Sequence, residues 1–388
     1  MSNYKLIFVS YVVLMIYWLE IDFLTPAFIS AAKAFHVPYK YMQSIMGLDL
    51  LFRCASMFVI GHLSDCIGRR KVIINSALVV VVGSLICYVA NSFVLFSIGK
   101  IMQGVACSVS ALTYAVIGDN KSKKDAFFIV SIIHFLLIVG MVTAPILGSK
   151  VVHYFSWKGS FFVIFVFSIF AYITSHLLPK REVITNTKFS LKYATLKFIA
   201  ILKKFSVTKY VFMYSILIGF LSGWTVEYPG FLTNVFGIKI QNIGYYQSVV
   251  LFSSAMTNLY IGFFKSHIDP LIVLRKGVIF CNIVALAIAS LLFMKNVPIE
   301  LVILSICVFS CGISLITCSA ITYYYKNFAH SKGSATSVDV VVQNLLASVG
   351  VYLIIAIDLS SVAKLVLMMI GTTVICNALY FLKKERLE

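Results

Sequence analysis

Long apolar runs separated by short polar segments repeat along almost the whole chain. A helix needs roughly 20 apolar residues to cross the hydrocarbon core of a bilayer. Twelve runs are close to that length or longer, and they fall near 6–30, 41–60, 72–90, 93–118, 126–150, 159–178, 210–234, 243–264, 272–294, 299–325, 333–357 and 360–382. Most of the connections between them are short. The pattern predicts an all-α membrane protein with twelve transmembrane helices.

One longer polar segment interrupts this pattern at its centre. Residues 179–209 carry eight cations among polar and apolar residues. We therefore expect an N-terminal six-helix half (1–178), a basic cytoplasmic linker (179–209) and a C-terminal six-helix half (210–388). Two short echoes support pseudo-symmetric halves, since Glu20-Ile-Asp-Phe-Leu-Thr resembles a stretch starting at Glu227, and a Tyr-x-Gln-Ser pattern also recurs.

Within the linker, residues 191–205 have helical spacing, with lysines on one face and Leu, Phe and Ile on the other. Such a helix lies in the membrane interface and is attracted by anionic lipid. We expect anionic lipid to contact Leu191–Lys209. The alternative is a solvated linker.

Composition agrees with a membrane protein. Of the 388 residues, 61% are hydrophobic and 12% are charged. A single soluble core of this length cannot bury so much apolar surface, so the bilayer has to take the place of the solvent.

The net charge of +18 raises the question of nucleic acid as a partner. Alternating topology, however, places most cations on one side, including Arg69–Lys71, the linker lysines and Lys383–Arg386. The opposite side holds only Lys33, Lys40, Lys150, Lys158, Lys239 and Lys295. This asymmetry follows the positive-inside rule and predicts that both termini are cytoplasmic. We expect no nucleic-acid partner.

Residue types that carry catalysis or bind metals are scattered. The nine cysteines form no C-x-x-C pair and the seven histidines do not cluster. No G-x-x-x-x-G-K-(S/T) loop is present, so ATP is not the expected energy source. The sequence therefore predicts no metal site, no cofactor and no enzyme. A membrane sensor is disfavoured too, because it would need a soluble effector domain, which we do not expect here.

The segment between the second and third runs is the most specific feature of the chain. It reads Gly61-His62-Leu63-Ser64-Asp65-Cys66-Ile67-Gly68-Arg69-Arg70-Lys71. It resembles, nearly position for position, the signature loop of the major facilitator superfamily, G-x-L-(S/A)-D-x-x-G-R-(R/K). The resemblance implies twelve helices in two halves around a central cavity, and alternating access.

The same resemblance implies a cytoplasmic latch made of Gly61, Asp65, Gly68, Arg69 and Asp119. Asp65 is expected at the N-terminus of the eleventh helix, near residues 332–334, where a carboxylate meets the positive end of the helix dipole. Arg69 is expected to pair with Asp119, which closes the fourth helix. The alternative is a charge cluster that only sets topology.

Two acids lie in the first predicted helix. Asp22-Phe-Leu-Thr-Pro26-Ala-Phe resembles the D-x-x-x-P-A-(L/F) run of drug:proton antiporters of the bicyclomycin-resistance type. Pro26 cannot donate to the carbonyl of Asp22, so a bend is expected there. Glu20 and Asp22 point about 200° apart on a helix. The resemblance makes Asp22 the expected proton-coupling residue, with Glu20 turned toward a neighbouring helix or the outer mouth.

The fourth and fifth helices extend the resemblance. Lys100-Ile-Met-Gln103-Gly104 is similar to R-x-x-Q-G, with Lys in place of Arg, and Lys100 is expected to pair with Asp22 or Glu20 unless it snorkels outward. Gly140, Pro145 and Gly148 lie in a stretch similar to G-x-x-x-G-P-x-x-G-G and predict a helix bend.

Further charged and aromatic residues complete the candidate sites. Asp49 and Arg53, four residues apart, are expected to neutralise each other. An aromatic cavity with carboxylates suits lipophilic or cationic molecules. The candidates for the substrate cavity are Trp18, Gln103, Trp224, Glu227, Tyr228 and Asp339.

Together these features predict proton-coupled efflux of a small organic molecule or drug by a monomer in a bacterial inner membrane. The expected partners are the substrate, protons and membrane lipid. A metabolite carrier remains the alternative: a siderophore or amino-acid exporter, or a proton symporter for uptake.

Overall fold

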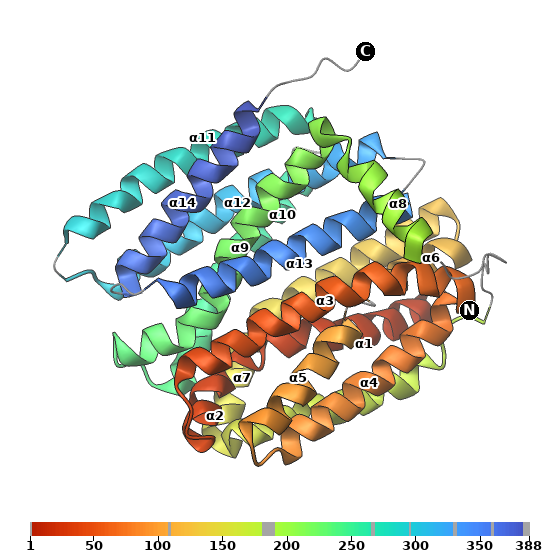
Figure 1. The fold of residues 1–388 in the computed structure, drawn as a ribbon, viewed down its shortest axis with the longest axis horizontal. Helices are drawn as coiled ribbons and strands as arrows, with labels where there is room; N and C mark the ends of the chain where they lie inside the picture. Colours follow the sequence, from red (N-terminus) through yellow and green to blue (C-terminus); the bar gives the residue numbers. More distant parts are fainter. Residues whose placement is uncertain are drawn as a thin grey trace. The chain divides into compact units, whose positions relative to one another are not determined.

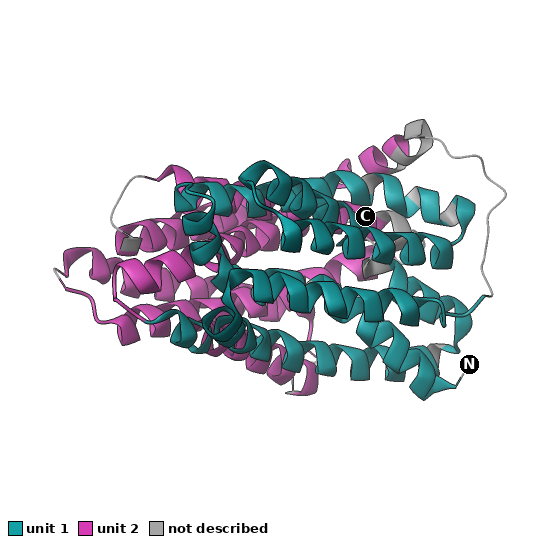
Figure 2. Ribbon diagram, turned by 90° about the horizontal axis from the view of Figure 1, so that it is seen from below, with its two compact units in different colours: residues 1–194, 239–245 teal, residues 195–238, 246–388 magenta. Residues whose placement is uncertain are grey.

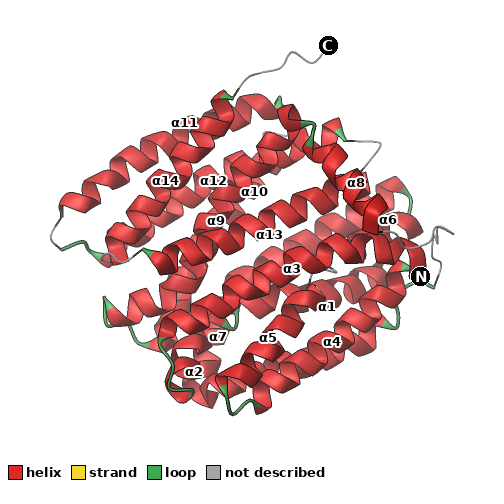
Figure 3. Cartoon of the chain, viewed as in Figure 1, coloured by secondary structure: helices red, strands yellow, loops and turns green. Residues whose placement is uncertain are grey.

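The computed structural model describes residues 2–107, 110–180, 191–264, 268–294, 296–328, 332–357 and 361–382. These residues are almost entirely helical and contain no strand (Figures 1 and 3). The elements are α1 (Asn3–Asp22), η1 (Thr25–Ala27), α2 (Phe28–Ala34), α3 (Tyr39–Ile67), α4 (Arg69–Val89), α5 (Phe93–Cys107), α6 (Ser110–Asn120), α7 (Lys123–Ser175), α8 (Leu191–Leu202), α9 (Phe205–Asn234), α10 (Ile240–Phe264), α11 (Pro270–Ala289), η2 (Ser290–Phe293), α12 (Ile299–Asn327), α13 (Lys332–Ala356) and α14 (Ser361–Phe381).

Each of the twelve apolar runs overlaps one of these helices, and the all-α prediction is confirmed. Ten helical stretches of the described residues are long and apolar enough to cross a membrane. Two predicted runs share one of them, Lys124–Ser175, and α10 is not among the ten. The count of twelve spanning helices therefore stays a prediction, as does the pseudo-symmetry of the halves.

The longest helix, α7, contains the break expected between the fifth and sixth runs. Ser156 alone departs from helical geometry, with φ 65° and ψ 177°. A positive φ is unusual for a residue other than glycine. Pro145, by contrast, lies inside α7 without ending it.

The chain packs as two compact units, coloured separately in Figure 2. Unit 1 is Met1–Ala194 with Lys239–Tyr245, and unit 2 is Thr195–Ile238 with Tyr246–Glu388. The linker expected at 179–209 contains α8 (Leu191–Leu202), and its last five residues, 205–209, already belong to α9. Lys209 was expected in this linker, but it is buried and its Nζ donates to the backbone oxygen of Leu382 at 2.7 Å.

Glycines allow close helix crossings inside each unit. In unit 1, a Cβ on Gly83 of α4 would lie 2.9 Å from the backbone oxygen of Gly99 on α5. In unit 2, a Cβ on Gly219 of α9 would lie 2.8 Å from the backbone oxygen of Leu346 on α13. Small residues of this kind let membrane helices approach closely. Close packing matters in a membrane because lipid is as apolar as the helices, so hydrophobic burial does not drive their association.

A cluster of aromatic rings packs the C-terminal end of α2 against α5 and α7 in unit 1. The Phe96 ring lies 5.4 Å from Phe35 and 5.1 Å from Phe161, measured between centroids. Trp157 closes the cluster at 5.0 Å from Phe35. The cluster fixes the position of α5, the helix that carries Lys100.

Candidate functional site

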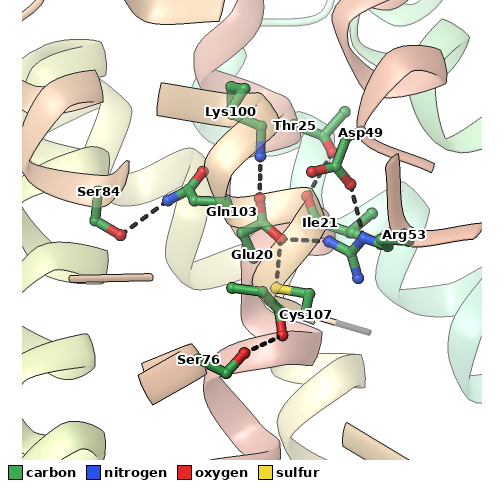
Figure 4. A network of polar contacts seen from close by, with 11 residues as sticks. Glu20, Ile21, Thr25, Asp49, Arg53, Ser76, Ser84, Lys100, Gln103 and Cys107 are labelled. Carbon is green, nitrogen blue, oxygen red and sulfur yellow. Dashed lines mark hydrogen bonds and ion pairs between the residues drawn. The ribbon is translucent and has the colours of Figure 1, made fainter. Parts of the chain in front are cut away.

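Glu20, near the end of α1, is the centre of a buried charge network in unit 1 (Figure 4). Its side chain is fully buried, with no exposed surface. Its Oε1 accepts from Lys100 Nζ on α5, and its Oε2 accepts from Arg53 Nη2 on α3. The Cys107 thiol donates to Oε2 at 3.2 Å. Two helices, α3 and α5, thus place donors on one carboxylate of α1.

Arg53 connects this carboxylate to a second one. Its Nε donates to Asp49 Oδ2 at 2.8 Å, one turn earlier on α3. Asp49 is fully buried, and its Oδ1 has no hydrogen-bond partner among the described residues. The two acids and two bases of the network, Glu20, Asp49, Arg53 and Lys100, carry charges that sum to zero when all are ionised. Mutual neutralisation offsets the large cost of burying each charge.

One face of α5 supplies the groups around the network. Lys100, Gln103, Gly104 and Cys107 are three, four and seven residues apart, so they lie on the same side of the helix. Gln103 Nε2 donates to Ser84 Oγ at 2.8 Å. Because Gly104 lacks a Cβ, α5 can approach α3 closely, and a Cβ there would lie 2.7 Å from the backbone oxygen of Asp49.

Asp22 is the last residue of α1 and is buried, with 6% of its surface exposed. After it the chain leaves the α-helix, and Pro26 sits in the 3-10 turn η1. The Thr25 hydroxyl donates to the backbone oxygen of Ile21 at 2.6 Å, which satisfies one carbonyl at the end of α1. Of the two acids of α1, Glu20 is the one that joins Lys100. The side chain of Trp18 lies outside the described residues.

Small residues of the bend predicted in α7 pack this helix against α1, and the bend itself stays a prediction. A Cβ added to Gly140 would collide with the Met15 side chain, and one on Gly148 would collide with the backbone oxygen of Phe23. Pro145 is between them, within the helix. These contacts hold α1, and therefore Glu20 and Asp22, against α7.

The signature loop forms a tight connection between α3 and α4. Gly68 has φ 97° and ψ 135°, a conformation that favours glycine, and α4 starts at the next residue. Arg69 forms an ion pair with Asp119, with 26% of each side chain exposed. Gly61 lies on α3. The side chain of Asp65 lies outside the described residues, so its expected contact near residue 332 stays a prediction.

Arg70, for which no structural role was predicted, binds the far end of α7. Its Nη2 donates to the backbone oxygen of His176 at 2.7 Å and its Nε to that of Leu178 at 3.0 Å. Carbonyls at a helix C-terminus lack intrahelical partners, and an Arg side chain can satisfy them. In the sequence, Arg69 and Arg70 are simply two adjacent arginines. Nothing there indicates that one forms an ion pair and the other binds backbone carbonyls.

In unit 2, the candidates on α9 are buried beside α10 and α14. Trp224 Nε1 donates to Gln247 Oε1 at 2.8 Å, and the Trp224 and Tyr228 rings lie 6.0 Å apart. Glu227 has no cation close to it in the sequence, and its Oε1 lies 3.5 Å from Lys364 Nζ. The partner comes from a helix distant in sequence.

Asp339 lies apart from this pair, on α13. It is buried, and its Oδ2 accepts from the Tyr325 hydroxyl of α12 at 2.7 Å. Its Oδ1 has no hydrogen-bond partner among the described residues. Asp339 therefore differs from Glu20, Asp49 and Glu227, each of which is paired with a cation.

The arrangement contains no obvious metal centre. In the part of the chain that the structure describes, no group of three or more His, Cys, Asp or Glu side chains could hold a metal ion.

Comparison with known proteins gives one family match that covers most of the chain. The model of the Major Facilitator Superfamily matches residues 10–351. A chloramphenicol resistance protein, CraA of Acinetobacter baumannii, is 26% identical over 172 residues, which are 44% of this chain and 42% of that protein. The multidrug transporter MdfA of Edwardsiella ictaluri is 23% identical over 244 residues, 61% of this chain and 58% of that one.

The multidrug resistance protein MdtM of Escherichia coli is 24% identical over 157 residues, or 40% of this chain and 38% of that protein. The chain thus spans less than two thirds of the length of these curated relatives. The solved structure of the human organic anion transporter MFSD10 is similar with a TM-score of 0.64 and 15% identity, covering 98% of this chain and 99% of that one. This likeness shows the fold, and together these matches point to a membrane transporter rather than an enzyme.

Proposed function

Because the chain belongs to the Major Facilitator Superfamily, we propose that it is a secondary active transporter that exports a small organic molecule in exchange for protons. The relatives named for chloramphenicol and multidrug resistance support a drug-like substrate. The observation that carries the proposal is the buried network of Glu20, Arg53, Asp49 and Lys100. Ionisable groups inside spanning segments are costly and usually serve transport or proton relay.

The network gives a physical reason for proton coupling nearby. The four charges of the network balance one another. If a neighbouring carboxyl loses its proton, it adds a charge that the network does not compensate, in a medium of low dielectric constant. Glu20, held by two cations and a thiol, acts as a fixed anion in the proposal. Asp22, two residues further at the end of α1, is the proposed proton carrier. Lys100 stabilises the neighbouring anion, Glu20.

The proposal assigns the cytoplasmic latch to conformational control. Arg69 and Asp119 are paired and partly exposed, which suits a contact that has to break and re-form. Asp65 is proposed to belong to the same latch. Breaking these contacts accompanies the inward-facing state.

Location and further partners belong to the same proposal. We place the chain in a bacterial cytoplasmic membrane as a monomer with both termini inside. We propose that Trp224, Glu227 and Tyr228 of unit 2 contact the substrate, and that anionic lipid binds at α8. The exposed Leu196 and Ile199 of α8 support contact with a membrane surface.

The test is transport by purified full-length protein in proteoliposomes with an imposed pH gradient. Chloramphenicol is the first probe because of the CraA similarity, followed by a mixed panel of drugs and metabolites. The proposal predicts that substrate moves against its gradient, opposite to the proton flow. Movement of substrate with the protons would identify a symporter instead, and indifference to pH would remove proton coupling.

A further inference from the structure

Asp339 and Tyr325 form an isolated acid site in unit 2. Asp339 is 6% exposed, and among the described residues only its Oδ2 has a hydrogen-bond partner, the Tyr325 hydroxyl at 2.7 Å. The adjacent Tyr324 is fully buried and donates its own hydroxyl to the backbone oxygen of Ala335 at 3.1 Å. One neutral phenol, that of Tyr325, thus contacts the carboxyl, and Oδ1 stays unsatisfied among the described residues.

The charged groups on the helices of unit 2 next to α13 are engaged elsewhere or exposed, among the described residues. Lys209 of α9 donates to a backbone carbonyl just after α14. Glu227 of α9 pairs with Lys364 of α14. Lys326 of α12 is exposed at the end of its helix. In the described ranges, no ion pair includes Asp339. An ionised carboxylate here would thus be buried without a compensating charge, which is strongly unfavourable.

A neutral carboxyl removes the uncompensated charge from this site. When protonated, it carries no charge, and its second oxygen still accepts from Tyr325. The proton then sits on Oδ1, the oxygen that has no donor. We propose that Asp339 is a second proton-binding site of the transporter, located in unit 2 and separate from the Glu20 network. Its part in transport rests on the proposed function, whereas proton binding by Asp339 does not.

The position of Asp339 allows proton exchange with water at one membrane surface. Tyr325 is two residues from the end of α12, and the spanning part of α13 starts at Ala335. Asp339 is four residues further, about 6 Å along the helix. The connection between the two helices is short and, in the expected topology, cytoplasmic. A modest movement of this helix end would hydrate the carboxyl and release its proton to the cytoplasm.

Infrared difference spectroscopy of the full chain in lipid vesicles tests proton binding directly. A protonated carboxyl gives a carbonyl stretching band that an ionised one lacks. At neutral pH we expect the wild type to show this band and Asp339→Asn to lose the part of it that Asp339 contributes, because Asp22 is a second proposed proton carrier. Glu227→Gln is the matched control, because this acid of the same unit is ion-paired, and it should keep the band. An Asp339→Asn spectrum identical to that of the wild type overturns the proposal.

Two further measurements keep the test decisive. If Asp339→Asn fails to fold, Tyr325→Phe takes its place, because it keeps the acid and removes the donor to Oδ2. The carbonyl band should then shift to higher frequency. An unshifted band contradicts the proposal that the protonated carboxyl is that of Asp339. In proteoliposomes, Asp339→Asn should lose pH-driven accumulation but keep substrate exchange. A wild type that ignores the pH gradient rejects the proposed function, while the spectra still decide whether Asp339 binds a proton.

Discussion

Removing the charge of Lys100 should destabilise the protein through Glu20. The four network charges sum to zero, and Lys100→Met leaves a net charge of −1 in a fully buried site. Breaking a buried ion pair by removing one partner costs about 3–5 kcal/mol. Because Arg53 still contacts Glu20, we expect Lys100→Met to fall near the lower end of this range.

The double mutant separates charge balance from packing. Glu20→Gln alone leaves a net charge of +1 and should be destabilised by a similar amount. Glu20→Gln with Lys100→Met restores neutrality, so its loss should be smaller than the sum of the two single losses by roughly 3 kcal/mol. A coupling of this size is well above the ~0.5 kcal/mol within which independent sites add.

The assay is thermal and chemical unfolding of purified variants in one detergent, with all four members of the cycle measured together. Lys33→Met serves as the control, because this lysine of α2 is exposed and its replacement should change stability by no more than about 0.5 kcal/mol. Additive losses in the cycle would refute the claim that the network is held by mutual neutralisation.

Three other outcomes follow from the contacts. Arg69→Ala and Asp119→Ala should each slow transport with little change in substrate affinity. The double mutant should be no slower than either single mutant. If the two losses in initial rate multiply in the double mutant, the pairing is contradicted. Gly104→Ala should cost roughly 1–3 kcal/mol, because its Cβ would press on α3, whereas Gly118→Ala, with open space, should be neutral in the same unfolding assay. A peptide of residues 191–205 should become helical by circular dichroism on anionic vesicles and not on neutral ones, and lack of helix on both would exclude the lipid contact.

Hydropathy alone predicted most of the fold. Every apolar run overlaps a helix, because a chain in a bilayer has to satisfy its backbone hydrogen bonds within each segment. Local detail was harder to foresee. The break in α7 falls on Ser156, with neither Gly nor Pro there to signal it, and 205–209 joined α9 although their lysine suggested a linker.

Single ion pairs of the candidate site were predicted from the sequence, but the contact that joins them into one network was not. The spacing of Asp49 and Arg53 correctly suggested a pair, and Lys100 was expected to meet an acid of α1. That Arg53 also binds Glu20 could not be read from spacing, because it depends on how α1 and α3 pack. The partner of Glu227, Lys364, was missed for the same reason. Periodicity describes one helix at a time, whereas these contacts join helices far apart in sequence.

The central claim, that an acid of α1 couples protons to transport, is tested most directly by two fluxes measured on one variant. Asp22→Asn in proteoliposomes should retain substrate exchange at equal pH and lose accumulation driven by a pH gradient. Glu20→Gln, compared per amount of folded protein, should be milder in coupling because its carboxylate serves as a fixed anion. If Asp22→Asn still concentrates substrate against its gradient while Glu20→Gln does not, the roles of the two acids are reversed and the account is contradicted.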